Sequence, residues 1–202
     1  MIASGNRGKL AEIARLLAPL DLHVRPQSDW SIPPVAETGE TFKENALIKA
    51  RHASAIAGIP AIGDDSGLEV AALGGRPGVR SSRFAGETAT DEENIDKLLE
   101  ALRDLPEKDR NANFRCVAVY VESADDPQPL VAEGAWNGRI IDRRRGNGGF
   151  GYDPVFLDPD SDRTAAEMSG DEKNAASHRG QAFRMLSALI ADAMKVRGEV
   201  RT

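Results

Sequence analysis

Two adjacent carboxylates end a short apolar run in the stretch PAIGDDSGLEV, residues 60 to 70. Asp64 and Asp65 are followed at once by Ser66 and Gly67. Adjacent like charges repel each other, so we expect a positive group nearby. Mg²⁺ would meet this need, because it prefers carboxylates, water and substrate phosphates. The pattern is equally compatible with an acidic turn at the end of a strand.

Strand geometry separates the two aspartates. Successive side chains on a strand point to opposite faces, so one carboxylate should face a binding side while the other packs elsewhere. The residues alone do not decide which one faces the site.

A second candidate is the loop SGNRGK, residues 4 to 9. It combines a small hydroxyl, an amide, two glycines and Lys9 where a short strand is predicted to meet a helix. Backbone N–H groups and the helix dipole at such a point favour a phosphate, and Lys9 adds a positive charge. The spacing is not that of a Walker loop or a dinucleotide fingerprint. An ordinary Gly-Asn turn that caps a helix therefore remains an alternative.

The stretch GNGGFGYDP, residues 146 to 154, places four glycines beside two aromatic residues and Asp153. Glycines permit close backbone approach, and Phe150 or Tyr152 could stack on a flat ring. The alternative is a flexible surface loop before a strand. The preceding arginines, 143 to 145, are typical of a solvated charge run, and we assign them no role.

The fourth candidate is EKNAASHRGQA, residues 172 to 182, which contains Lys173, Ser177, His178 and Arg179. A lone histidine is more often structural than catalytic. Next to arginine and downstream of lysine, however, it completes a donor set that suits carbonyls and phosphates.

Composition and net charge indicate which classes of protein are compatible with this sequence. The 202 residues are 41% hydrophobic and 29% charged, which is ordinary for one globular domain, and no apolar segment approaches the ~20 residues that span a bilayer. The formal charge of −6 argues against nucleic acid and anionic membranes as partners. The start of the chain has no secretion signal pattern, so we expect a cytoplasmic protein. Cys116, the one cysteine, lies in an apolar run and is expected to be buried in a strand.

Periodicity predicts the elements that must position these residues. Apolar spacing predicts helices over 5–20, 42–57, 91–102 and 169–194, and the second and third carry capping boxes, Thr41 with Glu44 and Thr90 with Glu93. In the second helix Asn45 and Lys49 lie one turn apart on the face opposite the apolar stripe. The β-rich runs 113–122 and 129–141, separated by SADDPQ, predict a hairpin. An α/β fold with a mixed sheet follows.

Taken together, five blocks stand in the same order as in one family: SGNRGK, ETGETFKENALIKA, GDDSGLEVAALGGRPGVRSSRFAG, GGFGYDPVF and EKNAASHRGQA. The chain resembles the bacterial inosine/xanthosine triphosphate pyrophosphatases, also called HAM1-like, nearly from end to end. The resemblance implies one domain over 1–202, with an elongated central sheet, flanking helices and two lobes around a substrate cleft. It also implies a homodimer that hydrolyses ITP, dITP and XTP to the monophosphate and pyrophosphate with Mg²⁺.

The resemblance also implies roles for individual residues. Asp65 would be the general base and a metal-site residue, and Ser66 would contact the substrate. The triphosphate would lie on Ser4, Gly5, Asn6, Arg7, Gly8 and Lys9. Phe150, Gly151, Tyr152 and Asp153 would receive the base and sugar, and Lys173, His178 and Arg179 would complete the pocket.

The chain departs from the family pattern in two places. Members commonly carry two acidic residues before the Thr-Gly of the second block, whereas this chain has Ala36 and Glu37. We therefore expect Glu37 or water to replace the usual additional metal carboxylate. Only residues 1 to 3 precede the first block, so the first strand is expected to be short. Two other functions remain open: a hydrolase acting on other nucleotides, such as modified pyrimidines, and a nucleotide-sensing module without turnover.

Overall fold

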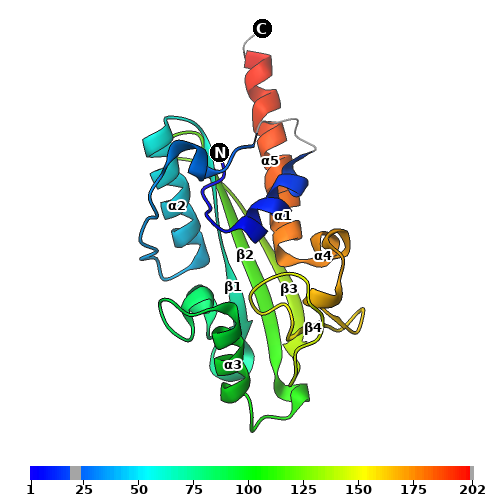
Figure 1. The fold of residues 1–202 in the computed structure, drawn as a ribbon. Coiled ribbons are helices and arrows are strands. Elements are labelled where there is room, and N and C mark those ends of the chain that lie inside the picture. Colours follow the sequence, from blue (N-terminus) through cyan, green and yellow to red (C-terminus); the bar gives the residue numbers. More distant parts are fainter. Residues whose placement is uncertain (19–23, 201–202) are drawn as a thin grey trace. The chain divides into compact units, whose positions relative to one another are not determined.

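The computed structural model describes residues 1–18 and 24–200, and it is an α/β protein (Figure 1). The α-helices are α1 Arg7–Leu17, α2 Phe42–Ala57, α3 Asp91–Ala101, α4 Gly170–Ala176 and α5 His178–Val200. The strands are β1 Ala61–Val70, β2 Asn111–Val121, β3 Leu130–Ile140, β4 Phe156–Asp158 and β5 Arg163–Thr164. Within the described residues, no helix has the length and apolar character needed to cross a bilayer.

One five-stranded sheet has the order β1-β2-β3-β4-β5. The β3–β4 and β4–β5 pairs are antiparallel, whereas Ile2 forms parallel bridges with Pro26 and Ile62. The mixed character of the sheet is therefore confirmed, and β2 and β3 are neighbours, as the hairpin prediction requires. The first predicted strand is reduced to the bridges made by Ile2.

The chain forms two compact units, and β1, β2 and β3 each contribute residues to both. Unit 1 comprises residues 1–65, 116–134 and 179–202, and unit 2 comprises residues 66–115 and 135–178.

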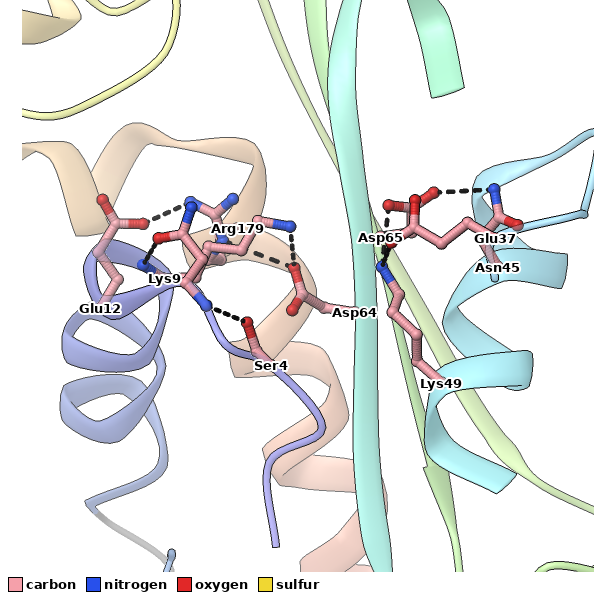
Figure 2. A network of polar contacts seen from close by, with 10 residues as sticks. Ser4, Lys9, Glu12, Glu37, Asn45, Lys49, Asp64, Asp65 and Arg179 are labelled. Carbon is pink, nitrogen blue, oxygen red and sulfur yellow. Dashed lines mark hydrogen bonds and ion pairs between the residues drawn. The ribbon is translucent and has the colours of Figure 1, made fainter. Parts of the chain in front are cut away.

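In unit 1, α2 lies on one side of β1 while α1 and α5 lie on the other (Figures 1 and 2). The core of the α1 and α5 side includes Ile13, Leu17, Cys116, Phe183 and Leu186. On the α2 side, a Cβ on Gly63 would lie 2.3 Å from the backbone oxygen of Ala46, so this glycine lets α2 approach the strand closely. The predicted burial of Cys116 is confirmed, and burial raises the pKa of its thiol to about 12.

In unit 2, the apolar residues of α3 share one core cluster with residues of β1, β2, β3 and β4. The core cluster contains Ile95, Leu98 and Leu102 together with Phe114 and Phe156, whose ring centroids lie 4.4 Å apart. This cluster supports the loop between β3 and β4 that carries the glycine-rich stretch.

Helix starts agree with the sequence, but one helix does not continue as predicted. Both capping boxes are present, at Thr41 with Glu44 and at Thr90 with Glu93. The predicted C-terminal helix is divided into α4 and α5, because Ser177 has an extended backbone with φ −68° and ψ 157°. Positions 19 and 20, predicted to end the first helix, lie outside the described residues.

Candidate active site

Asp64 and Asp65 lie next to each other on β1 and point to opposite sides of the strand (Figure 2). Their residues are only 2% and 5% exposed, so each carboxylate has lost most of its contact with water. Each has a lysine partner: Lys9 Nζ lies 3.0 Å from Asp64 Oδ2, and Lys49 Nζ lies 3.1 Å from Asp65 Oδ1. The expectation of positive charge beside the acidic pair is confirmed.

On the side of α1 and α5, Asp64 belongs to a network of four charges. Arg179 Nε lies 4.0 Å from Asp64 Oδ2, and the Arg179 guanidinium also forms an ion pair with Glu12 of α1. Burial disfavours the charged form of Asp64, but Lys9 and Arg179 outweigh this effect and hold its pKa below the ordinary value. Asp64 therefore stays ionised. Within the described chain, its buried Oδ1 accepts no hydrogen bond.

The loop of residues 4 to 9 lies at the start of α1, as predicted. Asn6 is the N-cap residue, and its side-chain oxygen accepts a hydrogen bond of 3.0 Å from the backbone N–H of Lys9. Ser4 Oγ accepts a hydrogen bond of 3.3 Å from the backbone N–H of Asn6. Gly5 and Asn6 are exposed, so the positive end of this helix is accessible to an anion. Of Arg7, the structure describes only the helical backbone.

On the side of α2, Asp65 contacts two residues that sequence analysis did not assign to the site. Asn45 Nδ2 donates to Asp65 Oδ2 over 3.3 Å, and its own side chain is held by hydrogen bonds of 2.8 and 3.3 Å with the backbone of Gly39. Lys49 Nζ donates both to Asp65 and, over 3.0 Å, to Glu37 Oε1. Asn45 and Lys49 therefore face β1. Both lie within the block ETGETFKENALIKA, and their place in that block was the available signal.

Burial and charge shift the titration of this group. Burial raises the pKa of Asp65 above its ordinary value; Lys49 only partly offsets burial, and Glu37 adds to the rise. The carboxylates Asp65, Asp64 and Glu37 outweigh the burial of Lys49 and raise its pKa. The ammonium of Lys49 is thus a fixed positive charge between two carboxylates.

The carboxylates of Asp65 and Glu37 suit a metal ion whose other ligands are water and substrate oxygens. Within the described residues, no group of three or more His, Cys, Asp or Glu side chains could hold a metal ion. Asp65 and Glu37 nevertheless meet at one cation, the Lys49 ammonium. Mg²⁺ is commonly held by only one or two carboxylates together with water and substrate phosphates. Two carboxylates around one positive group fit that requirement.

In unit 2, Asp153 organises the glycine-rich loop. Its Oδ2 accepts hydrogen bonds from Lys173 Nζ over 2.6 Å and from the backbone N–H of Phe150 over 2.9 Å. Lys173 Nζ also lies 4.8 Å from the centre of the Phe150 ring, which is only partly buried. Gly149 has φ +76°, and a Cβ there would lie 2.0 Å from Asp153 Oδ2, so only glycine fits.

The other predicted residues of unit 2 lie in different environments. The ring of Tyr152 belongs to the core, its hydroxyl donates to the Ser81 backbone oxygen over 2.8 Å, and burial raises its pKa. Of the two aromatic residues, Phe150 is thus the one with an accessible ring. His178 is 4% exposed and stacks on Phe114 with centroids 4.8 Å apart. Ser66 is partly buried on β1, and Gly151 N–H donates to Asp91 Oδ2 over 2.7 Å.

Comparison with known proteins identifies relatives over nearly the whole chain. A dITP/XTP pyrophosphatase of Photorhabdus laumondii is 51% identical over 193 residues, covering 96% of this chain and 98% of the relative. That of Coxiella burnetii is 52% identical over 196 residues, covering 97% and 98%. A solved structure of a HAM1 protein from Coxiella burnetii superposes with a TM-score of 0.86 at 52% identity, covering 95% of this chain and 97% of that one.

A Staphylococcus aureus Ham1 structure superposes with a TM-score of 0.83 at 42% identity, covering 95% of this chain and 97% of that one. The model of the Ham1 family matches residues 1–189. These likenesses confirm the resemblance inferred from the five ordered sequence blocks. The chain belongs to the Ham1 family.

Proposed function

We propose that this protein hydrolyses deaminated purine nucleoside triphosphates, namely ITP, dITP and XTP, to the monophosphate and pyrophosphate. The enzyme class follows from the family, whose similar members are dITP/XTP pyrophosphatases. One observation carries the proposal: Asp65 and Glu37 share the Lys49 ammonium on one side of β1. A protein that only senses a nucleotide gains little by holding carboxylates beside a triphosphate.

The reaction between the α- and β-phosphates needs an oriented water, neutralised phosphate oxygens and a leaving group held by cations. We assign Asp65 as the base that orients the water and takes its proton. Mg²⁺, held by Asp65 and Glu37, would neutralise charge on the phosphate oxygens when bound. The N–H groups of residues 4 to 9 and the Lys9 ammonium hold the polyphosphate end.

The residues of unit 2 are assigned to the nucleoside end. Phe150 offers its accessible ring for stacking on the base, and the Asp153–Lys173 pair holds that ring in place. By resemblance, Gly151 and Tyr152 belong to this group, and His178 and Arg179 complete the pocket. The resemblance assigns Ser66 a contact with the substrate. A 6-oxo purine presents an acceptor where adenine presents a donor, so fixed donors such as Arg179 or backbone N–H groups disfavour ATP, and such a mismatch can discriminate by ~10⁴.

The decisive experiment is pyrophosphate release from ITP with and without Mg²⁺, for the unmodified chain and for Asp65→Asn. Removing a general base costs about 10²- to 10⁴-fold in turnover, and we expect ITP binding to be largely retained. Unchanged turnover would overturn the assignment of Asp65. Turnover of XTP, dUTP and ATP, measured alongside, separates this activity from hydrolysis of pyrimidine nucleotides.

Two further expectations stay predictions. The family resemblance predicts a homodimer, and the sequence predicts a cytoplasmic location. Neither is needed for the assignment of the site residues.

A further inference from the structure

The arginine run 143 to 145 precedes the glycine-rich loop, and its members have different environments. Arg143 is exposed and makes no ion pair within the described part of the chain. Arg144 donates to Glu92 Oε2 over 2.8 Å and to Asp96 Oδ1 over 2.7 Å, and both partners lie on the exposed surface of α3. Of the three, only Arg145 pairs with a carboxylate that is partly buried, Glu167. The three consecutive arginines, 143 to 145, therefore have three different environments in the fold.

The Arg145 guanidinium lies close to both carboxylate oxygens of Glu167. Arg145 Nε lies 3.2 Å from Glu167 Oε1, and Arg145 Nη2 lies 2.9 Å from Oε2. The guanidinium also donates to the backbone oxygen of Asp162 over 3.0 Å. Glu167 in turn accepts the backbone N–H of Thr164 over 2.8 Å. One N–H···O bond and one close ion-pair contact therefore join the guanidinium to the two carboxylate oxygens of Glu167.

The backbone of Arg145 is tied at the same place. Its N–H donates to the Pro154 oxygen over 2.9 Å, and its own oxygen accepts the Thr164 hydroxyl over 2.8 Å. Gly146 follows with φ +80°, and a Cβ there would lie 2.5 Å from the backbone carbon of Ala166. The start of the loop therefore lies directly against the segment that carries Glu167.

The same segment also contacts the end of the loop. The N–H of Gly148 donates to the Ala166 oxygen over 3.0 Å, and the N–H of Ala166 donates to the Asp153 oxygen over 3.2 Å. Asp153 is the residue that holds the Phe150 backbone and Lys173. A short chain of contacts thus connects the Arg145 guanidinium with the aromatic ring assigned to the base.

We propose that Arg145 is a positioning residue: its ion pair with Glu167 holds the glycine-rich loop against residues 164–167 and so sets the place of the Phe150 ring. The inference rests on the proposed function, because it concerns the nucleoside end of that substrate. It assigns Arg145 no contact with the nucleotide.

The test is steady-state hydrolysis of ITP by Arg145→Gln, with inorganic tripolyphosphate as a competitive inhibitor. Misplacing a base platform weakens substrate and transition state alike, so we expect KM to rise about tenfold with kcat within about threefold of the unmodified enzyme. Tripolyphosphate has no base, so its inhibition constant should change by less than about twofold. A general loosening of the protein would raise the KM for ITP and the inhibition constant of tripolyphosphate together, and that result would overturn the proposal.

The matched control is Arg143→Gln, which removes the same charge two residues earlier and should leave both constants unchanged. Glu167→Gln keeps an oxygen for the Thr164 N–H but loses the charge, and it should reproduce the effect of Arg145→Gln. If either single variant fails to fold, Arg145→Lys replaces it, because lysine keeps the charge and leaves Glu167 in place but lacks the planar guanidinium. A raised KM for ITP with an unchanged tripolyphosphate inhibition constant in Arg145→Lys supports the proposal, and a KM equal to that of the unmodified enzyme overturns it.

The outcomes separate the two levels of inference. If the unmodified protein releases no pyrophosphate from ITP, the proposed function fails. If it does so and Arg145→Gln has the KM of the unmodified enzyme, the proposed function stands and the positioning role fails.

Discussion

Asp64 is a buried anion whose nearest charged partners are Lys9, at 3.0 Å, and Arg179, at 4.0 Å. Asp64→Asn would leave those two cations facing a neutral amide in a nearly dry environment. Breaking a buried ion pair by removing one partner costs about 3–5 kcal/mol. We therefore expect the free energy of unfolding, measured by urea denaturation, to fall by about that amount.

The control for this prediction is Glu87→Gln. Glu87 pairs with Arg80 at 2.9 Å, but both side chains are mostly exposed, at 72% and 60%. Exposed substitutions change stability by about 0.5 kcal/mol or less. Equal losses in the two variants would contradict the view that Asp64 neutralises a buried cation cluster.

At the same scale, sequence reasoning located the acidic pair but not all of its partners. The expectation of opposite orientations for Asp64 and Asp65 followed from strand geometry alone and is confirmed. The inward orientation of Asn45 and Lys49 could not be read from their spacing, because a helix pattern shows which residues share a face but not what that face meets. The pairing of Arg145 with Glu167 could not be predicted from the sequence for a similar reason, because a loop and two strands separate the two residues along the chain.

At the scale of elements, Gly63 determines how closely α2 approaches β1. A Cβ there would lie 2.3 Å from the Ala46 oxygen and 2.7 Å from the Ala50 nitrogen, and both are backbone atoms. Overpacking of this kind typically costs about 1–3 kcal/mol, so Gly63→Ala should lower the free energy of unfolding by that amount. It should also weaken ITP binding, since Asn45 and Lys49 sit on the displaced helix.

Gly198→Ala provides the matched substitution. Gly198 lies in α5 with nothing within 4 Å of a Cβ placed on it. Alanine is favoured over glycine by about 0.5–1 kcal/mol in a helix interior, and Gly198 lies in the last turn of α5, where the gain is smaller. This variant should therefore be as stable as the unmodified protein or slightly more so. If Gly63→Ala, measured in the same way, leaves the free energy of unfolding unchanged, the close approach of α2 to β1 is refuted.

Local signals account for what could be predicted of the elements. Thr41 and Thr90 mark helix starts because a capping box satisfies backbone donors within four residues. The break at Ser177 carries no such signal, since helix-compatible residues continue on both sides. Tertiary packing decides that break: His178 stacks on Phe114, and Arg179 pairs with Glu12.

At the scale of the whole molecule, the prediction of one domain can be tested through the two units. Because β1, β2 and β3 each run through both units, we expect a single cooperative unfolding transition. The two tryptophans report separately, Trp30 from unit 1 and Trp136 from unit 2. In Trp30→Phe, the fluorescence of Trp136 and the far-ultraviolet circular dichroism should have the same urea midpoint.

Trp136→Phe provides the reciprocal measurement. It removes a 3.0 Å hydrogen bond to Asp158 and should be less stable, but its two probes should still coincide. Separate midpoints for fluorescence and circular dichroism in either variant would mean that the units unfold independently.

The buried thiol of Cys116 has a practical consequence for all such measurements. A sulfur atom that is sealed in the interior and protonated at neutral pH cannot react with an alkylating reagent until the surrounding strands separate. The rate of covalent labelling of this sulfur atom therefore measures how often unit 1 opens. The measurement needs no engineered probe, because the unmodified chain already contains the thiol.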